Sequence, residues 1–199
     1  MENKHINPWL HIWTEPRKTL RSILNTDPRR LILWLAIVGG ILSAFSMTLI
    51  LWVRSPYNQT LQHPFFIGGA LIAGIVMGIF HLYFGGWIYT LTGSWLGGKG
   101  NFTDLKCAVG WSNYPFIVTT LLNILSFIVF PHFVIQAIFA FLNLVAAIWG
   151  LVIFMNLIGE AHRFSAWKGL LTFLIALVLI IAVFMIISLI VPLVTPLFQ

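Results

Sequence analysis

The chain has 199 residues, of which 59% are hydrophobic and only 8% are charged, and its mean hydropathy is +0.96. A soluble domain carries about 25% charged residues, so this composition excludes a soluble enzyme, a disordered chain and a disulfide scaffold. The net charge of +6 does not indicate nucleic-acid binding, because the basic residues are few and their placement follows loops rather than one face. The single cysteine excludes an internal disulfide and a cysteine-based zinc cluster. We therefore predict a polytopic membrane protein.

The first 30 residues are basic and are predicted to hold a broken amphipathic helix. Thr14 is the expected N-cap, and Pro16 stands in the first turn, where a missing N–H costs least. Tryptophan together with basic side chains suits a helix at the headgroup level of an anionic membrane leaflet. The alternative is a solvated arm whose charges only set the orientation. The residues expected at the membrane interface are Trp9, Trp13, Arg17, Lys18 and Arg21.

Five apolar segments follow, each long enough to cross a hydrocarbon core that needs about 20 helical residues. Asp27 is the expected cap and Pro28 the expected first residue of the helix that contains the first segment. Helices are the only sensible assignment, since an open sheet would leave unpaired backbone groups in lipid. The predicted fold is all-α, with a cytoplasmic arm over 1–30 and a five-helix transmembrane domain over 31–199. Its spans are expected at about 31–53, 64–91, 105–130, 133–158 and 169–191.

The positions of the basic residues predict the orientation in the membrane. With five spans, ten of the eleven Lys and Arg residues fall on one side, and only Arg54 falls on the other. Positive residues accumulate in cytoplasmic segments, so the N-terminus is expected in the cytoplasm and Gln199 outside. The expected location is the cytoplasmic (inner) membrane.

Small residues recur at four-residue intervals in the first two expected spans. Such spacing lets two helix backbones approach closely in lipid. We expect these residues to pack helices within the bundle, with a contact between subunits as the alternative. They are Gly39 and Ser43 in the first span, and Ala70, Gly74 and Gly78 in the second.

No segment carries a convincing catalytic or cofactor motif. The stretch 93–100 nearly matches a phosphate-binding loop, but Gly100 stands where a Ser or Thr would hold magnesium. Ser112 could act as a nucleophile only with His81 or His132 as its base, and a role as an interhelical hydrogen-bond partner is favoured. The loop 160–168 holds too few ligands for a metal site. We therefore expect no catalytic residue, no cofactor and no metal.

Several short motifs, in their order along the chain, carry a family resemblance. They are Asp27-Pro28 before the first span, Gly97-Gly98-Lys99-Gly100, Trp111-Ser112-Asn113-Tyr114-Pro115, and Phe164-Ser165-Ala166-Trp167-Lys168. This order resembles the bacterial branch of the Yip-domain family, whose eukaryotic members interact with Ypt/Rab GTPases. The resemblance covers nearly the whole chain and implies a five-span membrane protein. The relatives have an acidic N-terminal domain where this arm is basic, which argues against GTPase binding.

The resemblance implies a role in membrane organisation rather than in chemistry, since eukaryotic relatives are linked to vesicle traffic, partner recruitment and membrane shape. We therefore expect a non-enzymatic membrane organiser or adaptor. Its expected partners are anionic lipids and a membrane or cytoplasmic protein, but no nucleic acid; homo-oligomerisation stays open. Two alternatives remain: a small-solute channel lined by polar residues such as Asn123 and Asn143, and a lipid-acting enzyme that uses Ser112 or His81.

Overall fold

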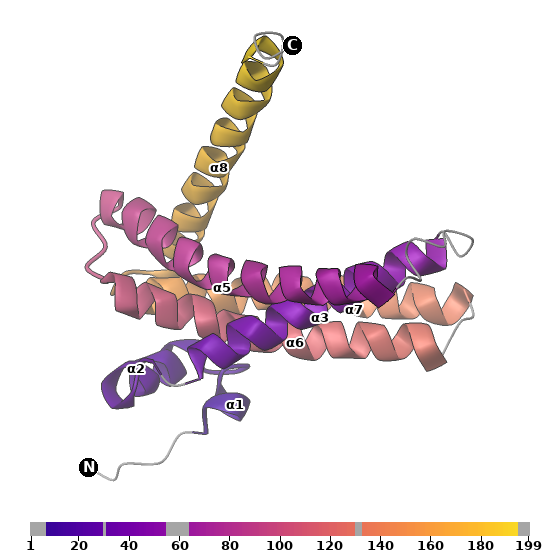
Figure 1. The fold of residues 1–199 in the computed structure, drawn as a ribbon. Helices are drawn as coiled ribbons and strands as arrows, with labels where there is room; N and C mark the ends of the chain where they lie inside the picture. The colour runs from indigo at the N-terminus through magenta and orange to yellow at the C-terminus, as the bar shows by residue number, and fades with distance from the viewer. Residues whose placement is uncertain (1–6, 30, 55–63, 130–132, 195–199) are drawn as a thin grey trace.

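The computed structural model describes residues 7–29, 31–54, 64–129 and 133–194, and all regular secondary structure in these ranges is helical (Figure 1). The predicted all-α class is therefore confirmed. Two short helices come first, and five long ones follow. The short helices are α1 (Pro8–His11) and α2 (Pro16–Thr26), and the long ones are α3 (Ile32–Arg54), α5 (Pro64–Trp95), α6 (Phe102–Val129), α7 (Phe133–Ala161) and α8 (Ala166–Val194).

The expected count of five membrane spans is not confirmed, because four helices in the described ranges are long and apolar enough to cross a membrane. These spans are Ile32–Leu51, Phe65–Trp95, Val134–Ala161 and Ala166–Ile190. The exception is α6, which contains the third expected span. Polar side chains recur along α6, from Asp104 and Lys106 near its start to Asn123 and Ser126 further on, and they interrupt its apolar runs.

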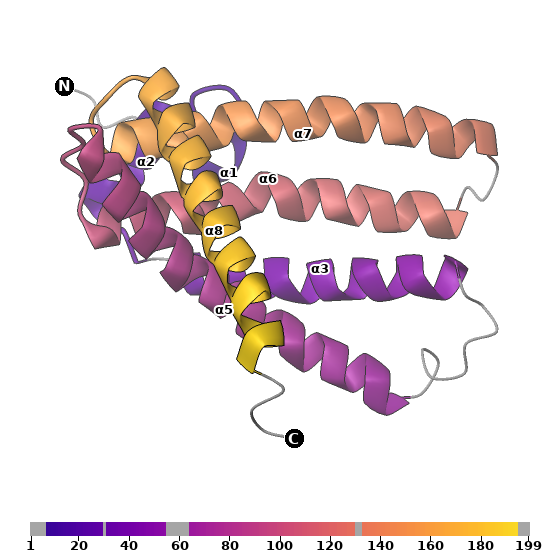
Figure 2. The same ribbon diagram turned by 90° about the horizontal axis from the view of Figure 1, so that it is seen from above.

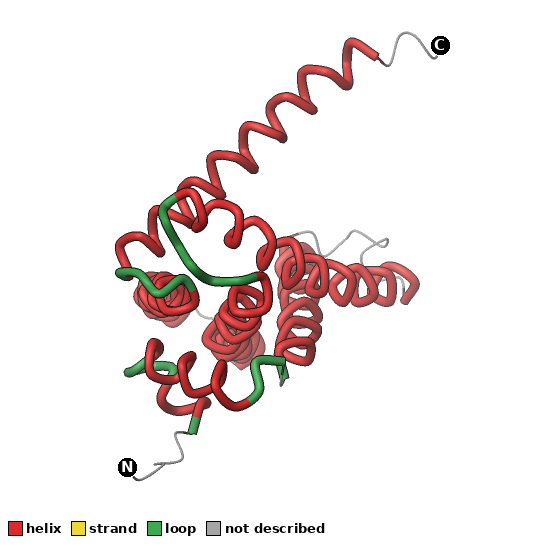
Figure 3. Tube along the Cα trace, turned by 90° about the vertical axis from the view of Figure 1, so that its left-hand side faces the viewer, coloured by secondary structure: helices red, strands yellow, loops and turns green. Residues whose placement is uncertain are grey.

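Four of the long helices lie side by side in one layer, in the spatial order α7, α6, α3, α5 (Figure 2). The last helix, α8, packs against α7 and α5 near its start and then diverges from the layer (Figures 1 and 3). Its side chains at 181–190 are exposed, and they are apolar apart from Ser188. The ends of α5 and α7 and the starts of α6 and α8 therefore meet at one end of the layer, next to α2.

Helices α3 and α5 touch through their backbones. A Cβ atom on Gly78 would overlap the carbonyl oxygen of Ala36, and one on Gly40 would overlap the carbonyl oxygen of Gly74. Only residues without a side chain fit such an approach, which brings the two helices into extensive contact. Gly74 and Gly78, singled out in the sequence, thus lie in a contact within one chain.

The other small residues of these two helices lie elsewhere. Gly39 faces Asn113 of α6, whose Oδ1 would be 3.5 Å from an added Cβ. The hydroxyl of Ser43 donates to the carbonyl oxygen of Gly39 over 2.7 Å, within the same helix. Ala70 is half-buried in the first half of α5. Gly39 and Ser43 each stand one residue before Gly40 and Ala44, which contact α5, and therefore lie about 100° away around α3.

Both helix starts predicted near the N-terminus differ from the structure. The N-cap of α2 is Glu15 rather than Thr14, because Pro16 takes the first helical position and holds the residue before it outside helical geometry. Asp27 ends α2 instead of capping the next helix. Its Oδ1 accepts a hydrogen bond from the backbone N–H of Arg29 over 3.0 Å, which makes a local turn, and α3 begins only at Ile32.

The amphipathic α2 is packed against protein. Its apolar residues Leu20 and Ile23 are buried in the main hydrophobic core, together with Leu105 of α6 and Leu157 of α7. Ile12, in the link between α1 and α2, is fully buried in the same core. The apolar face that the sequence assigned to a membrane surface is thus covered by α6 and α7. The part of the arm that holds α2 therefore packs as part of the helical domain.

Candidate functional site

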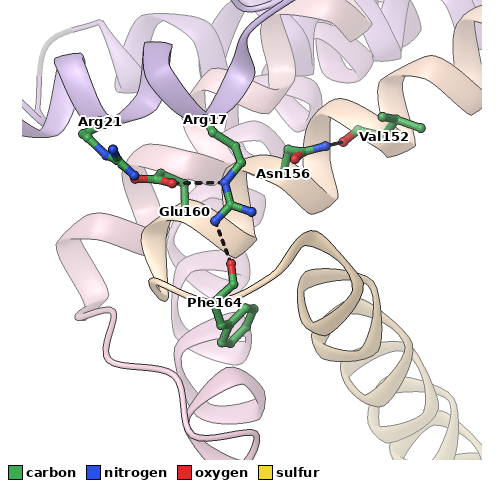
Figure 4. Close-up of polar contacts among 6 residues, drawn as sticks. All are labelled: Arg17, Arg21, Val152, Asn156, Glu160 and Phe164. Atoms are coloured by element: carbon green, nitrogen blue, oxygen red, sulfur yellow. Dashed lines mark hydrogen bonds and ion pairs between the residues drawn. The ribbon is translucent and has the colours of Figure 1, made fainter.

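Charged residues that are far apart in the sequence meet at the end of the layer where α2 docks. Glu160, the last residue but one of α7, is only 7% exposed. Its Oε1 accepts a hydrogen bond from Nε of Arg21 over 2.6 Å, and its Oε2 accepts one from Nε of Arg17 over 3.1 Å (Figure 4). Each carboxylate oxygen therefore has its own guanidinium partner.

The spacing of the two arginines explains this geometry. Arg17 and Arg21 stand four residues apart on α2, so both side chains project from one face of the helix. A carboxylate near a helix C-terminus is disfavoured by the helix dipole, and burial adds a desolvation cost. Two arginines offset both effects. The hydrogen bond to Glu160 also raises the pKa of Arg21, so this guanidinium stays charged.

Arg17 also fixes the turn between α7 and α8. Nη2 of Arg17 donates to the carbonyl oxygen of Phe164 over 2.7 Å (Figure 4). Lys18, which the sequence grouped with these arginines, faces elsewhere and pairs with Glu15 over 2.8 Å on the exposed side of α2. This pairing lowers the pKa of the Glu15 carboxyl. The five residues expected at a lipid surface therefore do not share one environment.

His162, in the turn after α7, joins three backbone segments. Its Nε2 lies 2.9 Å from the carbonyl oxygen of Tyr89, and its Nδ1 lies 3.3 Å from the backbone nitrogen of Gly100. Its own carbonyl oxygen accepts a hydrogen bond from the N–H of Lys99 over 3.1 Å. The imidazole stacks on the ring of Phe164, with centroids 5.1 Å apart. Burial lowers the pKa of His162.

The contact with His162 explains the glycines of the segment 93–100, which resembles a phosphate-binding loop in sequence. A Cβ atom on Gly93 or Gly98 would overlap the imidazole ring of His162. Gly97 has a φ of +80°, in the left-handed region that favours glycine. Gly100 packs against the carbonyl oxygen of Ala161. The segment is a turn that is shaped to receive His162.

Aromatic side chains attach the start of the arm to α6. The ring centroid of Trp9 lies 5.1 Å from that of Trp111 and 4.8 Å from that of Tyr114, and Trp13 lies 6.1 Å from Tyr114. Nε1 of Trp149 donates to the carbonyl oxygen of Trp13 over 3.1 Å. Edge-to-face and tilted pairs of this kind contribute about 0.5–1.5 kcal/mol each beyond the area they bury. Pro115 is buried next to Tyr114 in α6.

A pocket of about 500 Å³ opens beside the Glu160 pair, between α2, the start of α6 and the end of α7. Three guanidinium groups and two carboxylates line it, which leaves a surplus of one positive charge. Its lining residues are Arg17, Arg21, Leu24, Asn25, Asp104, Glu160, Ala161 and Arg163.

The structure thus brings some of the residues singled out in the sequence into these contacts and places others outside them. Trp167 is 72% exposed, and Asp27 and Pro28 lie in the turn after α2. Sequence reasoning missed the roles of Glu160 and His162. A usable signal was present, because Glu160 is one of only five acidic residues and follows a long apolar run. Such a carboxylate calls for a basic partner.

The residues considered for catalysis or transport have other partners. The hydroxyl of Ser112 donates to the carbonyl oxygen of Val109 over 2.7 Å. The side-chain amides of Asn123 and Asn143 bond to each other. His132 lies outside the described residues. Within the described ranges, no group of three or more His, Cys, Asp or Glu side chains could hold a metal ion.

Comparison with known proteins gives a match to a family model. No curated protein and no solved structure matches the chain. A family model described as the Yip1 domain matches residues 10–188, which include α2, the Glu160 pair, His162 and the glycine turn. The match covers most of the chain, and the protein belongs to the Yip1 domain family.

Proposed function

We propose that this Yip1 domain protein is a non-enzymatic membrane organiser or adaptor that works through the end of the molecule where α2 docks. The observation that carries the proposal is the anchoring of α2 on Glu160 by Arg17 and Arg21. A tether that only set the membrane orientation would need no ion pair with a buried carboxylate. The anchoring instead presents a basic and aromatic surface in a fixed position, as recognition of a partner requires.

The proposed orientation places this end in the cytoplasm and the C-terminus outside, in the inner membrane. The described basic residues support it, because those after α2, apart from Arg54, lie in the turn before α3, in the loop between α5 and α6, at the start of α6, or around the turn between α7 and α8. Among the basic residues that the structure describes, only Arg54 lies at the opposite end. Trp95 and Trp167 are exposed at the proposed cytoplasmic end, where aromatic side chains suit the headgroup level.

The proposed partners are anionic lipids together with a protein in the membrane or the cytoplasm. The arm offers side chains for such contacts, since Leu10 is 67% exposed and the Lys18 side chain is also 67% exposed. The absence of enzymatic activity is part of the proposal. It is supported by the bond of the Ser112 hydroxyl to its own helix backbone, which withholds that proton from a catalytic base.

Site-specific photo-crosslinking in native membranes tests the proposal. A photoreactive amino acid is placed at Leu10 in the arm, and a matched probe is placed at Val178, which is 64% exposed on α8. We expect discrete protein adducts at Leu10 that are missing at Val178, where lipid adducts should dominate. Glu160→Gln should weaken the Leu10 adducts by loosening α2. Identical adducts from both probes would contradict the proposal.

A further inference from the structure

We propose that the pocket between α2, α6 and α7 binds a phosphate group, and that a phospholipid headgroup supplies it. This inference rests on the proposed function, because it gives the docked arm a specific ligand. The pocket volume of about 500 Å³ lies in the range of roughly 300–1,000 Å³ that is typical of small-ligand sites. Guanidinium groups suit phosphate because their planar N–H pairs match two phosphate oxygens.

The carboxylates in the pocket do not oppose an anion as strongly as their number suggests. Both oxygens of Glu160 already accept hydrogen bonds from arginine Nε atoms. Asp104 stands in the first turn of α6, where the positive end of the helix dipole offsets its charge. Asp104 also takes part in the local cap, since its backbone N–H donates to Oδ1 of Asn101 over 2.9 Å. The surplus charge of the pocket is therefore carried by arginine.

The arginines retain donors for a ligand. Each guanidinium carries five N–H groups. Arg21 uses only Nε, and Arg17 uses Nε and Nη2, so N–H groups on the remaining nitrogens have no partner among the described residues. The side chain of Arg163 forms no hydrogen bond or ion pair with any residue that the structure describes. Two other basic residues at this end are engaged, because Lys168 donates to Leu96 and Lys106 lies over the ring of Tyr83.

The setting of the pocket favours a lipid over a soluble phosphate. Leu24 gives the lining an apolar wall, and Asn25 adds a neutral amide suited to a glycerol or ester oxygen. Exposed Trp95 and Trp167 lie at the same end of the molecule, at the expected level of the headgroups. A lipid could therefore place its phosphate among the arginines while its chains remain in the bilayer.

Arg163 is the residue to change, because Arg17 and Arg21 also hold the fold together. Arg163→Gln removes one positive charge and the N–H donors of one guanidinium group from the pocket. Arg29→Gln is the matched control, since Arg29 is an exposed arginine outside the pocket lining. Both variants lower the net charge equally, so non-specific attraction to anions changes to the same extent.

The test titrates the full chain in a neutral detergent with dihexanoyl phosphatidic acid, and measures binding by isothermal calorimetry. We expect saturable binding that Arg163→Gln weakens about tenfold, as loss of a charge-assisted hydrogen bond implies. Arg29→Gln should change the affinity less than twofold. Equal losses in both variants, or no saturable binding by the unmodified chain, would overturn the proposal.

Two further titrations identify the source of the phosphate. Dihexanoyl phosphatidylcholine, whose phosphate is masked by a cation, should bind much more weakly than phosphatidic acid. Inorganic phosphate that binds as tightly as phosphatidic acid would overturn the lipid source. These measurements need no protein partner, so failure here leaves the crosslinking test of the proposed function intact. Conversely, if the pocket binds lipid but the Leu10 probe gives no protein adducts, only the proposed adaptor role is contradicted.

Discussion

Nε2 of His162 lies 2.9 Å from the carbonyl oxygen of Tyr89, and this contact joins the turn after α7 to the last part of α5. Nδ1 of the same ring lies 3.3 Å from the backbone nitrogen of Gly100. The carbonyl requires a proton on Nε2, and the backbone N–H requires a lone pair on Nδ1. Both bonds therefore form together only with the neutral imidazole.

This geometry predicts that stability decreases in mild acid. Burial holds the folded-state pKa of His162 below its ordinary value of 6.5. The unfolded chain therefore takes up the proton more readily, and stability is lost as the pH falls through 6.5 towards the folded-state pKa. The hydrogen bond to the carbonyl oxygen of Tyr89 and the negative charge of Asp104 both favour the imidazolium and oppose this effect, but burial outweighs them. We expect the melting temperature of the detergent-solubilised chain to fall between pH 7.5 and pH 5.5.

Two variants distinguish the contribution of His162 to this pH dependence from that of the other histidines. His162→Gln should melt at a lower temperature than the unmodified chain at pH 7.5, and should lose less on acidification. His11→Gln is the control, because the His11 ring is far from His162 in the fold and hydrogen-bonds to the carbonyl oxygen of Asn7 at the start of the arm. It should keep the full pH dependence. An unchanged pH dependence in His162→Gln would assign the effect to another group.

Replacement of Glu160 by glutamine should loosen the arm. The amide keeps the size of the side chain but removes the negative charge that faces Arg17 and Arg21. Breaking a fully buried ion pair costs about 3–5 kcal/mol. Because the Arg21 side chain is 67% exposed, we expect a smaller loss of about 1–3 kcal/mol in the free energy of unfolding. Limited trypsin digestion should cut α2 faster in Glu160→Gln.

The matched control for this experiment is Glu15→Gln. Glu15 also pairs with a basic residue of α2, but the pair with Lys18 is exposed to solvent. Exposed pairs contribute about 0–1 kcal/mol, so digestion should change little. Similar acceleration in both variants would mean that the Glu160 pair does not anchor the arm.

The sequence predicts the helical class and the apolar helices well because their signals are local. Run length and composition alone mark α3, α5, α7 and α8 as membrane-length helices. The polar cluster is different, since Arg21 and Glu160 are 139 residues apart in the chain. Periodicity shows that α2 has an apolar face but does not show which element covers it. The placement of α2 on α6 and α7 therefore could not be read from the sequence.

The turn at 97–100 also shows that a local sequence pattern does not reveal a distant packing partner. The sequence indicates a turn at 97–100, since glycines cluster there. The reason for two of the glycines lies in His162, more than 60 residues away, whose ring occupies the space of their missing side chains. A local pattern therefore identified the turn, whereas its partner depends on the packing of α7 against the end of α5.

The backbone contact between α3 and α5 predicts that a single methyl group will destabilise the protein. Gly78→Ala adds a Cβ that would overlap the carbonyl oxygen of Ala36, and backbone cannot move aside easily. We expect a loss of about 1–3 kcal/mol in the free energy of unfolding. Gly68→Ala, in the same helix with open space around its Cβ, should be neutral or stabilising by up to about 1 kcal/mol. Equal effects would show that the helices do not meet at Gly78.

Asn123 and Asn143 form a reciprocal pair between α6 and α7, with both Nδ2–Oδ1 distances at 2.6 Å. Each amide also donates to its own helix, Asn123 to Thr119 and Asn143 to Phe139. All four amide N–H groups are thus used within the protein, which favours a role in helix association over one in lining a solute path. A double-mutant cycle with alanine at both positions should give a coupling energy of about 0.6–1.7 kcal/mol.

The control cycle pairs Asn123→Ala with Asn156→Ala. Asn156 donates to Val152 within α7 and forms no bond to Asn123, so these two changes should be additive. Unfolding in a mixed-detergent titration supplies the free energies. A coupling near zero between Asn123 and Asn143 would contradict the structural role. Measurable solute flux in liposomes that Asn123→Leu abolishes would then favour a channel, because an unpaired amide could serve a permeating solute instead.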